Sequence, residues 1–503
     1  MKRSGASALA GLLMAGVGLA ALSGTCAIAA PADPAAACAA LTAGGLFEHV
    51  AVTSANLVPA DPGKGLPAYC EVTASDSPVA GSKIGLVYRL PEDWNGKMLG
   101  LGGGGWAGNV TLQGAQAGLK AGYATAQTNG GHESTSPWET GWAAKPEAIT
   151  DFAYRAIHEM TGVGKQVVAR YYGKPQSKAY YQGCSTGGRQ GLMEVQRFPA
   201  DYDGVITGAP VYNLLVQTSA VVRNNTFSAA GGGFTQDQLN RVNQAVLASC
   251  DAQDGLKDGL LADPRACKWD PQEIQCKDGA AGGDCLSKTQ VEALRTAYRG
   301  VRTMDGRIAA WPLAKGGETG WSRFLSVSGP GTDATNGGGL GGLRGPILGD
   351  PNFDLGKFDP SSDLAKVRGG AFARAYEASD PVITAFTGKG GKLLMWHGWN
   401  DPGPSPIGTI AYYEQVAGVL PQGQSDVRLF LAPGVEHCGG GPGPDQFDLL
   451  GALDRWVQTG QPPATLLASK AGSKLSRPLC AYPAVARYKG GGDADDPASY
   501  ECR

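Results

Sequence analysis

A serine in a glycine turn and a histidine far along the chain could together form a nucleophile and its base. Residues 183–187 read Gly-Cys-Ser-Thr-Gly, and the flanking glycines permit a sharp turn that exposes the Ser185 hydroxyl. A hydroxyl is a weak nucleophile until a base takes its proton. Cys184 directly precedes the serine, and Cys438 directly follows His437. A disulfide between them would hold their Cα atoms roughly 5.5–6 Å apart and bring serine and histidine together. The alternative is that both cysteines pair elsewhere and His437 is a surface residue.

The third member of such a set is an acid that orients the histidine. In α/β hydrolases it lies between serine and histidine in the sequence. Asp401 fits, because it follows an apolar run that ends at Trp396 and could accept the Nδ1 proton of His437. His397 is a rival base, but it has no cysteine tether, so we expect it to be packed or hydrogen bonded. We expect His132 to be structural as well.

Ester cleavage also needs hydrogen-bond donors aimed at the charge that develops on the carbonyl oxygen. The backbone N–H of Thr186, directly after the serine, is one candidate donor. The run Gly102–Trp106 contains four glycines and follows an early apolar strand, and Gly105 is our preferred second donor. The alternative for this run is a flexible turn.

An acidic loop at residues 250–260 predicts a metal site. Three carboxylates within eight residues would repel one another without a counter-ion, and the glycines between them let their oxygens converge. Hard oxygen ligands favour calcium. The predicted ligands are side chains or carbonyls of Asp251, Asp254, Leu256, Asp258 and Leu260. The spacing is not that of an EF-hand, and the alternative is a solvated acidic loop. We expect the ion to be structural, because the loop falls in a predicted lid.

Strands alternate with helices around these residues, which predicts a largely parallel sheet. Apolar runs indicate strands at 83–90, 97–101, 121–127, 178–182, 391–397 and 426–432, and apolar periodicity indicates a helix over 151–172. The expected fold class is α/β, an α/β-hydrolase fold with a large inserted lid domain. Residues 31–213 and 386–503 would form the catalytic domain, and residues 214–385, where the alternation is lost, would form the lid.

Length and composition suit a globular protein of two units, with 503 residues, 42% hydrophobic and 17% charged. The net charge of −2 gives no support to nucleic-acid binding or to a polybasic membrane patch. Residues 1–30 have the basic start, apolar run and small-residue end of a secretory leader, so we expect a periplasmic or secreted product. No later apolar run is long enough to insert in a membrane.

Cysteine usage agrees with export. Of eleven cysteines, ten remain after loss of Cys26 with the leader, and an even number in an exported chain favours disulfides. No pair has the C-x-x-C spacing that zinc sites favour, which argues against zinc.

These features together resemble the tannase and feruloyl esterase family. The resemblance covers nearly the whole mature chain and rests on residues 183–189, the Cys-Ser and His-Cys neighbours, the acidic loop, and the ending from 477–480 through 487–490. It implies calcium at the five ligands named above. It also implies the disulfides Cys38–Cys70, Cys184–Cys438, Cys250–Cys267, Cys276–Cys285 and Cys480–Cys502.

Family members act on esters of aromatic acids, and the lid supplies the pocket for the acid. The resemblance therefore implies an exported serine esterase that hydrolyses esters of hydroxycinnamic, gallic or terephthalic acids through an acyl-enzyme. One member, which acts on a terephthalate ester, binds the free carboxylate of its substrate through a lid arginine, and Arg344 is the candidate equivalent here. The alternatives are an activity like that of a mono(2-hydroxyethyl) terephthalate hydrolase, a peptidase, and a catalytically silent hydrolase fold that serves as a binding protein.

Overall fold

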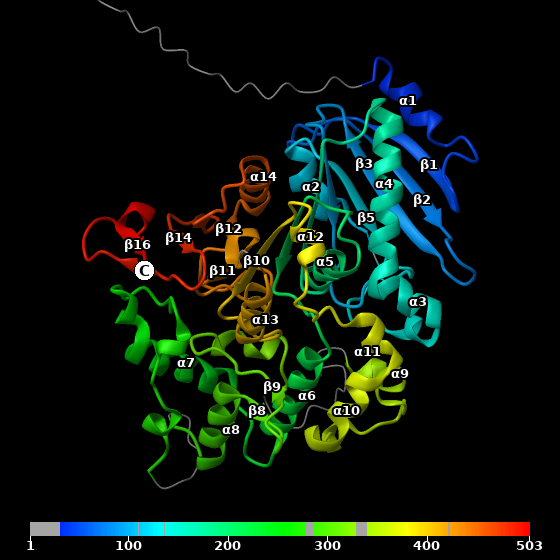
Figure 1. Ribbon diagram of the computed structural model, residues 1–503. Helices are drawn as coiled ribbons and strands as arrows, with labels where there is room; N and C mark the ends of the chain where they lie inside the picture. Colours follow the sequence, from blue (N-terminus) through cyan, green and yellow to red (C-terminus); the bar gives the residue numbers. More distant parts are fainter. Residues whose placement is uncertain (1–30, 109, 135, 278–284, 328–339, 421–422) are drawn as a thin grey trace, which may run out of the picture.

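The centre of the molecule is a nine-stranded sheet (Figure 1). The computed structural model describes residues 31–108, 110–134, 136–277, 285–327, 340–420 and 423–503. The strands stand in the order β1 (Val50–Val58), β2 (Tyr69–Asp76), β3 (Ile84–Pro91), β5 (Ala124–Thr128), β4 (Lys97–Leu101), β6 (Lys178–Cys184), β7 (Gly204–Gly208), β10 (Lys392–Gly398) and β11 (Val427–Ala432). The predicted leader, residues 1–30, lies outside the described residues.

The sheet is parallel only over its second part. The six strands from β5 to β11 in this order pair in parallel. The three pairings before them, β1 with β2, β2 with β3 and β3 with β5, are antiparallel. The sequence prediction missed β1 and β2. In β1 no residue is fully buried, so its apolar alternation is too weak to stand out.

Helices cover both faces of the sheet, as an α/β fold requires. Along one face run α4 (Ala156–Tyr172), α5 (Thr186–Arg197) and α13 (Pro406–Val419), which share one apolar core with the sheet. The other face is covered by α14 (Leu449–Thr459), whose Trp456 is fully buried. The expected helix over 151–172 begins instead with a π-helical turn at Asp151–Arg155. There the Arg189 guanidinium donates to the carbonyl oxygens of Phe152 and Ala153, so these oxygens have a side-chain donor in addition to the backbone of the helix.

Between β7 and β10 the chain is largely helical, and we keep the name lid for its predicted range, residues 214–385. It contains α6 (Leu215–Ser228), α7 (Gln236–Cys250), α8 (Lys288–Arg299), α10 (Pro360–Gly369) and α11 (Ala371–Tyr376), drawn in green to yellow below the sheet in Figure 1. Capping boxes at Thr235–Gln238 and Ser287–Gln290 start two of these helices. The sequence prediction named no helix in this segment, although both capping boxes can be recognised from the sequence.

All five disulfides implied by the resemblance are present. Their Cα–Cα distances are between 5.0 and 6.0 Å, and the sequence separation ranges from 9 residues for Cys276–Cys285 to 254 for Cys184–Cys438. In the described part of the chain, no helix has the length and apolar character needed to cross a membrane.

Candidate active site

Ser185 sits on a strained turn between a strand and a helix. Strand β6 ends at Cys184, α5 begins at Thr186, and Ser185 itself has a φ of 61°. This backbone conformation is unfavourable for a residue with a side chain, and it is the one that a nucleophile elbow requires. The turn also needs Gly183, because a Cβ there would lie 2.4 Å from the carbonyl carbon of Gly187. The predicted nucleophile elbow is therefore the observed local structure.

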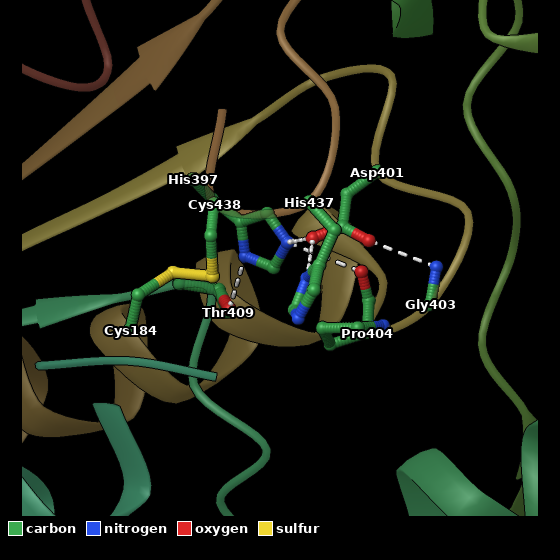
Figure 2. The surroundings of a disulfide bond; sticks show 8 residues. All are labelled: Cys184, His397, Asp401, Gly403, Pro404, Thr409, His437 and Cys438. Carbon is green, nitrogen blue, oxygen red and sulfur yellow. Dashed lines mark hydrogen bonds and ion pairs between the residues drawn. A yellow bond between two sulfur atoms is a disulfide. The ribbon is translucent and has the colours of Figure 1, made fainter. Parts of the chain in front are cut away.

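The disulfide Cys184–Cys438 brings the histidine loop to this turn. Its Cα atoms are 6.0 Å apart, and Figure 2 shows the bond, which joins Cys184 to the residue directly after His437. Ser185 and His437 line the same cavity. The structure thus places together the two residues whose cysteine neighbours suggested the pairing.

Asp401 is hydrogen bonded to His437. The Asp401 Oδ2 atom accepts a hydrogen bond of 2.6 Å from His437 Nδ1, and Oδ1 accepts one of 2.8 Å from the Gly403 N–H (Figure 2). With Nδ1 as the donor, Nε2 of His437 is left as the free acceptor that a general base needs. Burial alone would raise the pKa of Asp401, but His437 and the hydrogen bonds of the two histidines hold it down at about 2. Asp401 is therefore an anion at neutral pH.

His397, the rival base, is a second partner of the same carboxylate. It is fully buried, and its Nε2 lies 3.1 Å from Asp401 Oδ2 and 3.1 Å from the Pro404 carbonyl oxygen. Both atoms are acceptors, so Nε2 must carry the proton. The other ring nitrogen lies 2.8 Å from Thr409 Oγ1, which fixes the ring (Figure 2). Burial excludes His397 as the base, and this contact with the acid was not predicted.

Some backbone N–H groups around the serine have no hydrogen-bond acceptor in the described contacts. In the glycine run, the N–H groups of Gly102, Gly103 and Trp106 donate to Gln182 O, Gln190 Oε1 and Pro137 O respectively. Among the described contacts, the N–H groups of Gly104, Gly105 and Thr186 have no acceptor. The Thr186 hydroxyl donates to the Gly105 carbonyl over 2.8 Å, which ties the two loops together. The structure therefore leaves both predicted oxyanion donors, Gly105 and Thr186, available beside the serine.

Gly105 is also required by its backbone. Its φ is 57°, and a Cβ would lie 2.6 Å from Pro137 Cβ and 2.7 Å from Pro137 O. Since no side chain fits this space, the run is a fixed turn rather than a flexible one.

The cavity at Ser185 has a volume of about 520 Å³ and takes one wall from the lid. The lid wall contains Val216, Gln217, Ala220, Phe324 and Leu325, and the opposite wall contains Trp106, Trp138 and Val211. No Lys or Arg belongs to the described lining. Space for an aromatic ring beside the serine is therefore enclosed by apolar and neutral groups.

Lid and catalytic loops are tied at several points. Phe324 packs edge-on against His437 with ring centroids 5.0 Å apart, and Arg323 forms an ion pair with Glu436, the residue before that histidine. Arg223 on α6 is buried and donates to the carbonyls of Gly403 and Trp311, and burial lowers its pKa to about 10. These contacts explain how a helical insertion comes to shape a site on the sheet.

Two further residues of the sequence prediction lie apart from the chemistry. His132 donates from Nε2 to the Trp106 carbonyl oxygen over 2.8 Å, stacks on Trp142, and has a pKa lowered by burial. Because its partner is an acceptor, Nε2 is the donor. Arg344 donates to the Phe353 carbonyl and is not among the residues that line the cavity.

The acidic loop is compact, with its carboxylates turned to backbone N–H groups. Asp251 accepts from Asp258 and Gly259, Asp254 accepts from Leu256, and Asp258 also pairs with Arg477. Burial, with the neighbouring Asp258 and Asp251, raises the pKa of Asp254 to about 6. Among the described residues, no group of three or more His, Cys, Asp or Glu side chains is arranged to hold a metal. The all-oxygen donor set fits calcium by its chemistry, and calcium stays a prediction.

Comparison with known proteins supports the same reading over most of the chain. A family model described as "Tannase and feruloyl esterase" matches residues 70–503. The chain is 32% identical to the mono(2-hydroxyethyl) terephthalate hydrolase of Piscinibacter sakaiensis, over 87% of this chain and 85% of that protein. It is also 32% identical to feruloyl esterase B of Aspergillus niger, over 86% of each.

The crystal structure of feruloyl esterase B from Aspergillus oryzae is similar in fold as well. It matches with a TM-score of 0.84 at 28% identity, covering 94% of this chain and all of that one. The sharp turn at Ser185, the disulfide beside it and the glycine turn at Gly105 occur in a chain that belongs to the tannase and feruloyl esterase family.

Proposed function

We propose that this carboxylic ester hydrolase cleaves esters of aromatic acids, with Ser185, His437 and Asp401 as its triad. The observation that carries the proposal is the shared cavity in which the strained serine and the acid-bound histidine meet an apolar lid wall. Trp106, Phe324 and Leu325 offer flat, apolar surface of the kind that packs against an aromatic ring.

In the first half of the reaction, His437 Nε2 takes the Ser185 hydroxyl proton while the serine oxygen attacks the ester carbonyl. The negative charge on the carbonyl oxygen is stabilised by the N–H groups of Gly105 and Thr186. As the carbonyl re-forms, the bond to the alcohol breaks, and His437 gives its proton to the leaving oxygen. Asp401 stays ionised throughout and stabilises the imidazolium.

In the second half, water attacks the acyl-enzyme. His437 takes a proton from the water, the same two N–H groups hold the oxyanion, and the bond to Ser185 Oγ breaks. The serine recovers its proton from His437 and the aromatic acid leaves.

The acyl group favoured by the cavity is uncharged beyond its ester. A terephthalate monoester carries a free carboxylate, and burying it without a cation is costly. The described lining holds no Lys or Arg, and Arg344 is engaged elsewhere. Hydroxycinnamate and gallate esters are therefore the better candidates, and terephthalate monoesters the weaker ones.

Export and calcium belong to the proposal too. Five disulfides suit an oxidising compartment, which agrees with the predicted leader and a periplasmic or secreted enzyme. A structural calcium ion at the acidic loop would offset the repulsion around Asp254. Chelation should then lower the melting temperature, and added calcium should restore it. D254N should remove this response and D93N, which changes an exposed acid elsewhere, should keep it.

The test of the activity is hydrolysis of methyl gallate, methyl ferulate, chlorogenate and mono(2-hydroxyethyl) terephthalate by the purified mature protein. We expect turnover of at least one of the first three and labelling of Ser185 by a fluorophosphonate. Labelling without turnover of any ester would retain the hydrolase and reject the aromatic substrates. Absence of both would overturn the proposal and favour a binding protein.

A further inference from the structure

A second cavity lies on another side of the segment that holds the catalytic acid. Its volume is about 590 Å³, and it shares no lining residue with the cavity at Ser185. The lid supplies most of its wall, and the catalytic domain supplies Trp399 and Ile407. Trp399 in this lining is four residues before Gly403, which lines the cavity at Ser185, so one segment of the chain contributes to both cavities. We call this second cavity the cleft.

Aromatic side chains form part of the cleft wall. Trp269 and Trp399 belong to this lining but are only 4% and 1% exposed, so each shows only a small part of its ring to the cleft. Tyr298 is held by a hydrogen bond from its hydroxyl to Glu318, which leaves its ring in the lining. Rigid aromatic walls bind flat apolar ligands at a low cost in side-chain entropy.

Four cationic side chains line the same cleft, and two of them have no acidic partner. Arg265 pairs with Asp263, and Arg295 pairs with Asp270 and Glu292. Lys315 Nζ instead donates to two backbone carbonyls, at 2.8 Å each, and Arg299 contacts only the Thr296 hydroxyl. Within the described residues, neither Lys315 nor Arg299 forms an ion pair.

Lys315 is the better placed of these two cations. Its ammonium has three donors, and the carbonyls of Cys267 and Trp269 use two of them. The ammonium also lies 5.6 Å from the centre of the Tyr298 ring. Burial lowers the pKa of Lys315, although the charges of Asp270 and Glu318 act in the opposite direction. An anion in the cleft would supply the missing partner.

We propose that the cleft binds an aromatic carboxylate, with its ring on the apolar wall that includes Tyr298 and Ile407 and its carboxylate at Lys315 and Arg299. A ring without charge would leave the two cations unpaired, and a small anion would leave the aromatic wall uncovered. The ligand therefore combines both features. This assignment rests on the cleft alone and does not depend on the proposed esterase activity.

The test uses the whole mature protein after a fluorophosphonate has blocked Ser185, so that the catalytic cavity is occupied. Calorimetric titration with benzoate, acetate and benzamide separates the contributions of ring and charge. We expect benzoate to bind saturably below roughly 10 mM, and acetate and benzamide to bind about tenfold more weakly. Equal binding of benzoate and either of the other two probes would overturn the proposal, as would no saturable binding of benzoate.

Substitutions of single charged residues test where benzoate binds. K315M should weaken benzoate about tenfold, and R299Q about threefold, because each removes a charge-assisted contact. K268M removes the same charge from an exposed neighbour that does not line the cleft, and should leave benzoate affinity unchanged. Equal loss in K315M and K268M would reject the site. Thermal unfolding checks each variant, and if K315M does not fold, R299Q and the three probes decide the question.

If the fluorophosphonate fails to label the protein, the titration is run on the unblocked chain with the same variants. Failure of labelling concerns the proposed esterase, whereas failure of K315M to weaken benzoate concerns the cleft. The two proposals can therefore fail separately.

Discussion

The cavity at Ser185 and the cleft at Lys315 are close in volume, about 520 and 590 Å³, and both lie where the lid meets the catalytic domain. They differ in charge. The described lining of the first contains no Lys or Arg, whereas four cations line the second. An ester carbonyl needs directed N–H donors and a neutral surface, while a carboxylate needs a cation. The difference indicates that the two cavities are suited to the two ends of one chemical conversion, an uncharged ester and an aromatic acid.

The two cavities are also fixed by different kinds of cross-link. Cys184 and Cys438 both line the catalytic cavity, and their bond joins residues 254 positions apart. Cys267 lines the cleft, and its bond to Cys250 closes a separation of 17 residues within the lid. The first bond fixes two loops of the catalytic domain against each other, whereas the second fixes local lid structure. The following predictions test how far the two cavities act independently.

The largest effect should come from S185A. Without the nucleophile, turnover of aromatic esters should fall by at least about 10⁴-fold. Benzoate binding in the cleft should be unchanged, because Ser185 does not line it. Calorimetry and initial rates on the same preparation measure both quantities. Loss of benzoate binding together with turnover would contradict the separation of the two cavities.

H397Q should act on the catalytic cavity alone. His397 donates to Asp401 and does not touch the substrate space, so it is a positioning residue. Loss of a buried hydrogen bond to a charged group should lower kcat by roughly 10- to 100-fold with little change in KM. T409V, which removes only the hydroxyl beside His397 Nδ1, should give a smaller decrease in kcat. A rise in KM at constant kcat would indicate instead that the cavity wall has moved.

A pair of substrates tests the neutral lining. Mono(2-hydroxyethyl) terephthalate and 2-hydroxyethyl benzoate differ only by one carboxylate on the ring. We expect kcat/KM to be roughly 10-fold or more lower for the charged ester, because no cation lines the catalytic cavity to receive it. L325R, which would place a cation in the lid wall, should narrow this ratio. Equal rates for the two esters with the unchanged protein would show that the carboxylate stays in solvent.

The smallest effect should be the pH dependence of benzoate binding. Burial lowers the pKa of Lys315 below the usual 10.5 of a lysine, so its positive charge is lost at a lower pH than that of an exposed lysine. Benzoate affinity should therefore weaken as the pH rises, before pH 10.5 is reached. K315R should keep its affinity over this range, since arginine stays protonated. A parallel decline in both proteins would exclude Lys315 as the cause.

Much of the catalytic site could be predicted from the sequence, because its signals are local or adjacent. The strand, glycine turn and helix around Ser185 lie within twenty residues, and the two cysteine neighbours connected that turn to His437 across 254 positions. Asp401 could be predicted as the acid because it follows an apolar strand and lies between the serine and the histidine in the sequence. The same adjacency argument gave one disulfide directly, and the family resemblance gave the others.

Other features depended on contacts that leave no pattern in the chain. His397 is four residues before Asp401, but only the turn between them brings Nε2 to the carboxylate. The edge strand β1 was not predicted because its side chains are only partly buried. The lid helices were not predicted because their capping boxes lie in a segment whose glycine-rich composition suggests loops.

The sequence by itself determined the family of this protein and predicted the residues of its chemistry, a serine nucleophile with a base and an acid. Only the tertiary structure decided what surrounds that chemistry. The neutral wall at Ser185 and the cationic cleft at Lys315 are each assembled from segments of both the lid and the catalytic domain. Local sequence fixes backbone conformation and residue type, but the charge and shape of a cavity arise from packing between segments that are distant in the chain.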